Sequence, residues 1–152
     1  MVQKGGFFMD DYRVQAVWQR VRQGTELEQI LARAIEEEYR SHVTYLAMAK
    51  CGRYPQLSAM AMQEAQHARE LETLYDLLFE CRPCRPRFGL PKIQNFCQAL
   101  REAYRGECEA KQNYLLMAKN HPAHEELFSR LARQEAAHAS CLHRMHHAAF
   151  RQ

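Results

Sequence analysis

The sequence predicts an all-α fold in which four long helices form an antiparallel bundle. Residues that favour helices dominate the 152-residue chain, which contains only six glycines and five prolines. These helix-breaking residues gather in a few places and leave four long uninterrupted segments. Within each segment apolar residues recur at intervals of three and four, the spacing that bundle helices bury against one another.

The start of the bundle is indicated by a helix stop followed at once by a helix start. We expect residues 1–24 to form an N-terminal extension, with a short helix over Asp10–Arg22 that Gly24 ends. Thr25 with Glu28 three positions later matches a capping box and predicts the first bundle helix.

The remaining boundaries follow from prolines and glycines. Gly52 and Pro55 separate the first two bundle helices, the segment 81–91 with three prolines joins the halves, and Pro122 opens the last helix. Because the joins are short, sequence neighbours are predicted to be antiparallel within a bundle domain over residues 25–150. The bundle helices are expected over about residues 25–50, 58–80, 92–120 and 122–150.

Every predicted buried stripe is interrupted near its middle by a polar side chain. The stripes otherwise consist of residues such as Leu31, Met48, Leu78 and Phe128. A carboxylate falls on the buried face of each helix, and the second and fourth helices add a histidine three residues later. These six residues are Glu38, Glu64, His67, Glu107, Glu135 and His138.

The two halves of the chain repeat one helix pair. Residues 45–50, YLAMAK, match residues 114–119, YLLMAK, and each segment follows its glutamate by seven positions. Residues 63–68, QEAQHA, match residues 134–139, QEAAHA. The repeat implies an approximate twofold axis through the core, and all six polar residues belong to it.

Buried charge of this kind points to metal ions. Four ionised glutamates in an apolar core would be very unfavourable unless positive charge neutralised them, and two divalent cations would do so. A Glu-x-x-His pair projects both groups from one helix face. A single such pair is usually a surface feature, but two pairs in phase with two further core glutamates favour a dimetal site. Carboxylate and imidazole ligands suit iron or manganese better than structural zinc.

This ligand order resembles that of the ferritin-like di-iron carboxylate proteins. Within that superfamily the segments EEEYRSHVTYLAMAK and QEAQHARELETLYDLL look like rubrerythrin. The resemblance covers about residues 25–149 and implies a ferritin-like bundle with two metal ions. Iron is the metal that the resemblance favours, and manganese is the alternative. It also implies reduction of hydrogen peroxide in oxidative-stress defence, with peroxide or dioxygen as the reacting partner.

Two features depart from the rubrerythrin pattern. Rubrerythrins carry a small iron domain with two Cys-x-x-Cys pairs, whereas this sequence has the single pair Cys81 and Cys84. A separate electron donor, such as a rubredoxin-like protein, is therefore expected. Rubrerythrins also carry an extra carboxylate one turn after the third-helix glutamate, where this chain has Ala110. Glu109 is rotated by about 100° from that face.

Two tyrosines occupy matched positions two turns beyond the first and third glutamates. We expect Tyr45 and Tyr114 to donate hydrogen bonds to metal-binding carboxylates, although simple core packing is the alternative. His42 lies one turn after Glu38, but its repeat partner is Lys111, which argues against a ligand role.

Three functions stay open at this point. The first is a peroxide-reducing dimetal oxidoreductase, and the second is ferrous iron oxidation and storage as in ferritins. The third is a dimanganese catalase-like disproportionation of peroxide. A large shell of subunits would favour storage, and a homodimer or other small homo-oligomer would favour the enzyme.

Composition excludes several other classes. The formal charge of +3 is small and its charges are interspersed, which argues against nucleic-acid binding. No apolar run is long enough for a membrane span, and no signal peptide is evident. Six cysteines without a secretory signal indicate reduced thiols and a cytoplasmic protein.

Overall fold

The computed structural model describes residues 11–149 and confirms the all-α prediction. The described chain forms four α-helices and one short 3₁₀ turn, with no strand among these residues. The predicted residues 1–10 of the extension and the predicted helix end at Phe150 lie outside the described part. The elements are α1 (Asp11–Ala49), α2 (Gln56–Phe79), α3 (Phe96–Asn120), η1 (Pro122–His124) and α4 (Glu125–Ala149).

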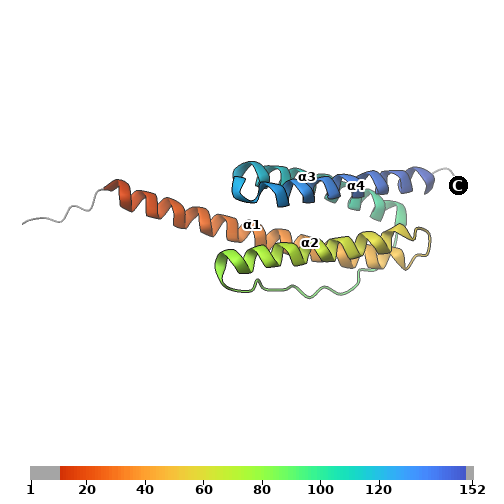
Figure 1. The fold of residues 1–152 in the computed structure, drawn as a ribbon. Coiled ribbons are helices and arrows are strands. Elements are labelled where there is room, and N and C mark those ends of the chain that lie inside the picture. The colour runs from red at the N-terminus through yellow and green to blue at the C-terminus, as the bar shows by residue number, and fades with distance from the viewer. Residues whose placement is uncertain (1–10, 150–152) are drawn as a thin grey trace, which may run out of the picture.

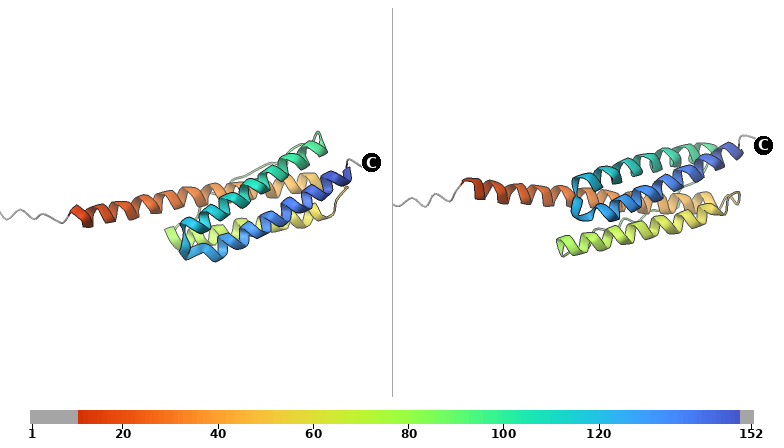
Figure 2. Two further views of the ribbon diagram at one scale, coloured as in Figure 1. Left: turned by 90° about the horizontal axis from the view of Figure 1, so that it is seen from above. Right: turned by 45° about the horizontal axis from the view of Figure 1, so that its top comes forward.

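The helices form two antiparallel pairs that lie side by side. α1 packs along α2, and α3 packs along α4 (Figure 1). Two further views show the same pairing, with the α3–α4 pair lying across the α1–α2 pair (Figure 2). This arrangement follows the internal repeat, because each repeat is one helix pair.

The join between the halves is a long crossover, which corrects one prediction. Short joins predict that all consecutive helices are antiparallel, but α2 and α3 run in the same direction (Figure 1). Residues 80–95 travel back along the bundle to the end where α2 began. The prolines at positions 83, 86 and 91 exclude a helix here without making a tight turn, so the segment stays extended.

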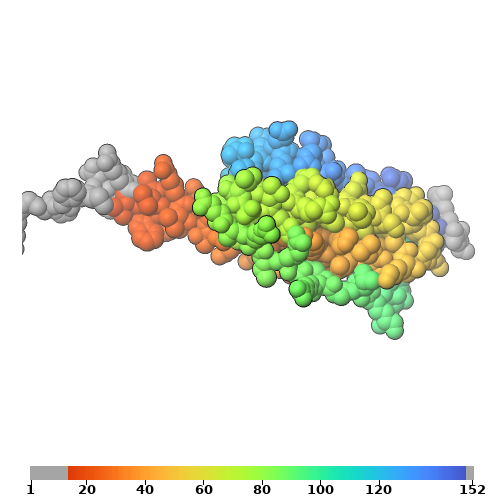
Figure 3. All heavy atoms as spheres, turned by 60° about the horizontal axis from the view of Figure 1, so that its bottom comes forward, coloured from red at the N-terminus to blue at the C-terminus, as the bar shows by residue number. Residues whose placement is uncertain are grey.

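Side chains attach this crossover to the first helix pair. The Arg85 guanidinium donates two hydrogen bonds to Glu72, at 2.6 and 2.9 Å, and lies over the ring of Tyr39. The Arg40 guanidinium lies 4.6 Å from the ring centre of Phe88. Figure 3 looks at this face and shows the green connection beside the orange surface of α1. The crossover is therefore held against the bundle.

The first helix is longer than predicted, because Gly24 does not end it. α1 continues through Gly24, and its N-terminal part projects beyond the bundle (Figure 1). Thr25 is not an N-cap, since its hydroxyl donates to the carbonyl of Val21 within the helix. One interior glycine costs about 1 kcal/mol, which the helix formers on both sides outweigh. The division into an extension and a bundle domain at residue 24 stays a prediction.

Two apolar clusters fill the bundle, one on each side of its middle. Each cluster takes buried residues from all four helices, and Leu31, Leu71 and Phe128 belong to the first while Met48, Leu57 and Leu142 belong to the second. The predicted stripes are therefore largely confirmed. Leu78 is an exception, because it is 38% exposed near the end of α2. Between the clusters lies the band of polar residues.

None of the described helices combines the length and the apolar character that crossing a membrane would require.

Candidate metal centre

The buried polar side chains of the described residues are the six that the sequence singled out. Their exposed fractions lie between 1% and 4%. Helical spacing explains this burial, because each residue continues the apolar stripe of its own helix. The six come from all four helices: Glu38 from α1, Glu64 and His67 from α2, Glu107 from α3, and Glu135 and His138 from α4.

These residues form two overlapping groups that could each hold a metal ion. Within each group the nitrogen and oxygen atoms lie within 4.8 Å of one another. Glu64 and Glu135 belong to both groups. The first group adds Glu38 and His67, and the second adds Glu107 and His138. The shared pair thus contains one glutamate from each half of the chain.

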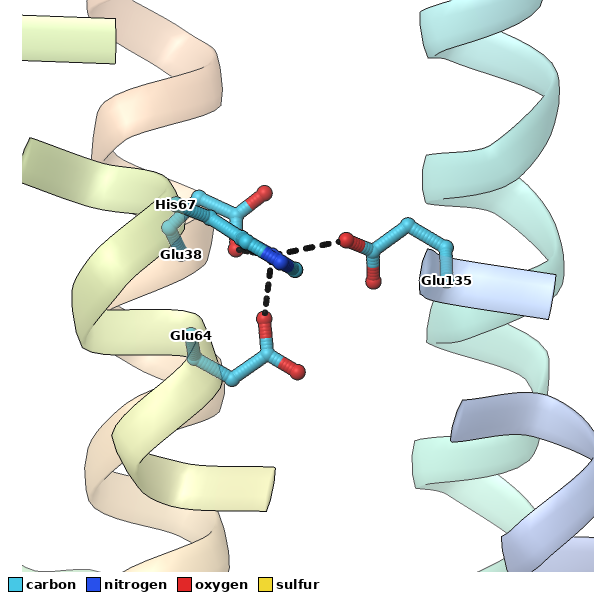
Figure 4. A group of neighbouring side chains, drawn as sticks. All are labelled: Glu38, Glu64, His67 and Glu135. Atoms are coloured by element: carbon cyan, nitrogen blue, oxygen red, sulfur yellow. Dashed lines mark hydrogen bonds and ion pairs between the residues drawn. The ribbon is translucent and has the colours of Figure 1, made fainter. Parts of the chain in front are cut away.

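Both imidazole rings turn the Nδ1 atom toward the carboxylates. His67 Nδ1 lies 2.9 Å from Glu135 and 3.3 Å from both Glu38 and Glu64. Figure 4 shows this ring between the three carboxylates, with Glu135 reaching in from the opposite helix pair.

The second imidazole repeats this arrangement. His138 Nδ1 lies 2.8 Å from Glu64 and 3.7 Å from Glu107 and from Glu135. In both groups an imidazole nitrogen and carboxylate oxygens therefore converge on one point.

The electrostatics divide the four carboxyl groups into two kinds. Burial raises the pKa of Glu107 to about 9 and raises that of Glu38 well above its usual value. Burial opposes ionisation of Glu64 and Glu135 too, but hydrogen bonds from the two histidines outweigh it and lower both pKa values.

The histidines show the complementary shift. Burial acts to lower their pKa, yet hydrogen bonds to the carboxylates raise the pKa of His67 and of His138 to about 12. Two protonated imidazoles then balance two ionised glutamates, while two glutamates keep their protons. Protons can thus neutralise the cluster in place of metal ions.

Unsatisfied atoms in the cluster fit a metal better than a closed hydrogen-bond network. Glu64 Oε1, Glu135 Oε1 and His138 Nδ1 are buried and lie at ion-pair distance from a histidine or a carboxylate, but none of them makes a hydrogen bond of good geometry. Buried groups with such poor hydrogen-bond geometry are costly, and bound divalent cations would satisfy all three. Oxygen and imidazole donors without thiolate suit iron or manganese.

The two predicted tyrosines contact the cluster across the twofold axis. The Tyr45 hydroxyl of α1 donates to Glu107 of α3, and the Tyr114 hydroxyl of α3 donates to Glu38 of α1. Both rings are nearly fully buried. Burial and the adjacent carboxylate raise the pKa of each tyrosine, so both stay protonated donors.

Residues expected to lie outside the cluster do so. His42 Nδ1 lies 2.6 Å from the Ala61 carbonyl oxygen on α2. Ala110 packs beside the first apolar cluster, and Glu109 is exposed. Cys81 and Cys84 are exposed free thiols on the crossover, and the two overlapping groups described above contain no cysteine.

Sequence reasoning missed a glutamine that contacts one of the histidines. Gln63 Oε1 lies 2.7 Å from His138 Nε2. Gln134, its repeat partner, instead accepts a hydrogen bond of 3.3 Å from Arg130. The signal was present, because each glutamine immediately precedes a repeated glutamate.

A cavity leads from the surface to one edge of the cluster. It has a volume of about 540 Å³ and lies between α1, α3 and residues 91–95 of the crossover. Tyr45 and Glu107 line it, together with Ser41, Ala103 and Gly106. Because Tyr45 and Glu107 are almost fully buried, they form the inner end of the cavity. A small molecule could therefore approach the cluster by this route.

Comparison with known families agrees with this geometry. The rubrerythrin family model matches residues 98–152, which cover almost all of α3 and the whole of α4. Comparisons with curated proteins and with solved structures found no match. The matched segment contains one glutamate and one Glu-x-x-His pair, and the internal repeat extends the same pattern to α1 and α2. Residues 98–152, rather more than a third of the chain, are thus similar to the rubrerythrin family.

Proposed function

We propose that this protein is a non-haem dimetal oxidoreductase that reduces hydrogen peroxide, with iron as its metal. The observation that carries the proposal is the pair of overlapping carboxylate–imidazole groups that share Glu64 and Glu135. Glu38 and His67 complete one group, and Glu107 and His138 complete the other. When bound, a ferrous pair supplies the two electrons that, with two protons, convert one peroxide into two water molecules.

The chain's own residues would position the ions and limit access to them. Glu64 and Glu135 belong to both groups and would help to hold both ions. The apolar clusters on either side exclude bulk water. The cavity between α1 and α3 is the route we assign to hydrogen peroxide.

Tyr45 is the residue we place nearest to the incoming substrate. Its hydroxyl holds a proton against Glu107 at the inner end of the cavity. That hydrogen bond would orient the carboxylate and keep a proton close to the reacting oxygen atoms. Tyr114 is assigned the matching role at Glu38, on the other side of the axis.

The proposal also includes an electron donor and an oligomeric state. Steady turnover needs two electrons for each peroxide, and we assign them to a separate donor such as a rubredoxin-like protein. A homodimer or larger homo-oligomer is the assembly we predict.

A single-turnover measurement tests this function. Protein loaded with iron and chemically reduced should consume about one peroxide per pair of ions, and repeated turnover should require an added reductant protein. Tyr45→Phe should slow the consumption of peroxide by the reduced protein and leave its metal content unchanged. Tyr54→Phe is the matched control, because that hydroxyl donates to the carbonyl of Met145.

Other outcomes would replace the proposal. Accumulation of many iron ions per chain in a large shell, without peroxide consumption, would establish ferritin-like oxidation and storage. Disproportionation of peroxide by the manganese form without any donor would establish a catalase-like reaction.

A further inference from the structure

The two histidines of the cluster differ in what their outward nitrogens contact. His138 Nε2 lies 2.7 Å from the Gln63 side-chain oxygen. His67 Nε2 is buried and has no hydrogen-bond partner. The inner nitrogens of both rings face carboxylates, with His67 Nδ1 within 3.3 Å of three glutamates and His138 Nδ1 2.8 Å from Glu64. The outward nitrogens are where a neighbouring glutamine contacts one ring and not the other.

The internal repeat provides a glutamine at the matching sequence position for His67 as well. Gln134 stands one residue before Glu135, as Gln63 stands one residue before Glu64. If the side chains followed the repeat, Gln134 on α4 would face His67 as Gln63 on α2 faces His138. Its side-chain oxygen nevertheless accepts from Arg130 Nη1 at 3.3 Å.

This arginine forms an ion pair that has no equivalent in the other repeat. The Arg130 guanidinium of α4 pairs with Glu70 of α2, in a contact that is only partly exposed. The positions related to Arg130 and Glu70 by the repeat are Ala59 and Cys141, which cannot form an ion pair. The two repeats therefore differ at this position, because only one of them has the ion pair.

This difference should change the metal affinity of the two sides. An imidazole that ligates through Nδ1 must carry its proton on Nε2, and an acceptor there fixes the tautomer and the ring orientation. Gln63 supplies such an acceptor for His138. His67 lacks one as long as Gln134 stays with Arg130. Loss of such an outer partner typically costs about 10- to 100-fold in metal affinity.

We propose that Gln63 is a positioning residue for His138, and that the Arg130–Glu70 ion pair makes the two metal sites unequal by withholding Gln134 from His67. The first divalent ion then binds on the His138 side, and the His67 side holds the weaker, more exchangeable ion. The inference rests on the dimetal site of the proposed function and not on its reaction with peroxide.

Cobalt(II) titration of metal-free protein, followed by absorption, tests the inequality. His67→Ala leaves the His138 group complete, and His138→Ala leaves the His67 group complete. We expect the His67→Ala variant to bind its single ion at least about tenfold more tightly than the His138→Ala variant. Equal affinities, or the reverse order, would overturn the proposal.

Substitutions behind the rings test the cause. In the His67→Ala background, Gln63→Leu should weaken cobalt binding by about tenfold or more, whereas Gln63→Glu should restore it by keeping an acceptor oxygen. The control is Gln112→Leu, at an exposed position on α3. An unchanged affinity in Gln63→Leu would exclude the positioning role.

Substitution of Arg130 tests whether the ion pair keeps Gln134 away from His67. In the His138→Ala background, Arg130→Met keeps the apolar stem, frees Gln134 and should tighten cobalt binding. Arg133→Met removes the same charge from an exposed neighbouring position and should leave the affinity unchanged. Equal effects of the two substitutions would show that only net charge matters, and would contradict the proposal.

Two further readouts keep the outcomes separable. If a single-histidine variant does not fold, the same glutamine and arginine substitutions in the full ligand set must alter different steps of a two-step titration. Absence of any cobalt binding would refute the dimetal site itself. Two ions bound with equal affinity would refute only this inference.

Discussion

At the scale of single residues, the cluster has groups that can carry either protons or metal ions. Glu38 and Glu107 favour their neutral forms, and His67 and His138 favour their charged forms. All four must lose a proton before they can act as ligands. Protons and divalent cations therefore compete for the same positions.

This competition predicts opposite pH dependences for the metal-free and loaded proteins. Protonated histidines stabilise the metal-free fold fully below their unfolded pKa of 6.5, and this contribution is lost as the pH rises toward their folded pKa of about 12. Glu107 acts in the same direction between 4.5 and about 9. Glu64 and Glu135 have lowered pKa values, so they do not change the pH dependence of the free energy of unfolding above pH 4.5.

The measurement is the melting temperature between about pH 6.5 and pH 9, the range set by these histidine and glutamate pKa values. It should fall with rising pH for the metal-free protein. It should hold or rise for protein kept at constant, limiting free metal, because fewer protons compete. Parallel profiles for the two forms would show that these groups do not exchange protons for metal.

At the scale of elements, the sequence predicts the helices well and the connections less well. Stripes at three-four spacing identify buried faces, so periodicity alone is enough to find the six cluster residues. Gly24 resembles a helix stop because local rules weigh one residue, whereas a helix sums the propensities of all its residues. The crossover could not be predicted, because prolines exclude a helix without specifying the direction of the chain.

The asymmetry behind the histidines was also beyond sequence reasoning. Gln63 and Gln134 are equivalent in the repeat, but Gln63 contacts His138, whereas Gln134 accepts from Arg130, which pairs with Glu70. These two residues lie on different helices, 60 positions apart. Such a pairing depends on how α2 and α4 face each other, which periodicity along one helix does not reveal.

The cavity between α1 and α3 yields a prediction for Gly106, which lines it beside Glu107. A Cβ added there meets nothing within 4 Å, so Gly106→Ala should favour the helix and leave access open. Gly106→Leu should project into the cavity and slow oxidation of the reduced metal centre by peroxide several-fold, with its metal content unchanged. Stopped-flow absorption measures this rate.

The same substitution far from the cavity provides the control. Gly24 also lies within a helix, with nothing within 4 Å of an added Cβ, on the part of α1 that projects from the bundle. Gly24→Leu should leave the rate unchanged. If Gly106→Leu reacts as fast as Gly24→Leu, the cavity is not the route of entry.

At the scale of the whole molecule, the cluster joins the two halves of the chain. Each group takes residues from both helix pairs, and the two shared glutamates come one from each pair. The tyrosine hydroxyls and the Arg130–Glu70 ion pair cross the same interface. Metal binding should therefore hold together two repeats that the crossover connects only at one point.

The metal-to-protein ratio of a small set of variants tests the dimetal site most directly. Protein loaded with iron(II) and freed of excess metal should retain two ions per chain, as should the exposed control variant Glu109→Ala. Removing a ligand of one group, in Glu38→Ala or His67→Ala, should leave about one ion. Removing a shared ligand, in Glu64→Ala or Glu135→Ala, should weaken both sites and leave close to none. A ratio below one in the unmodified protein, or shared-ligand variants that retain as much metal as Glu109→Ala, would contradict the account.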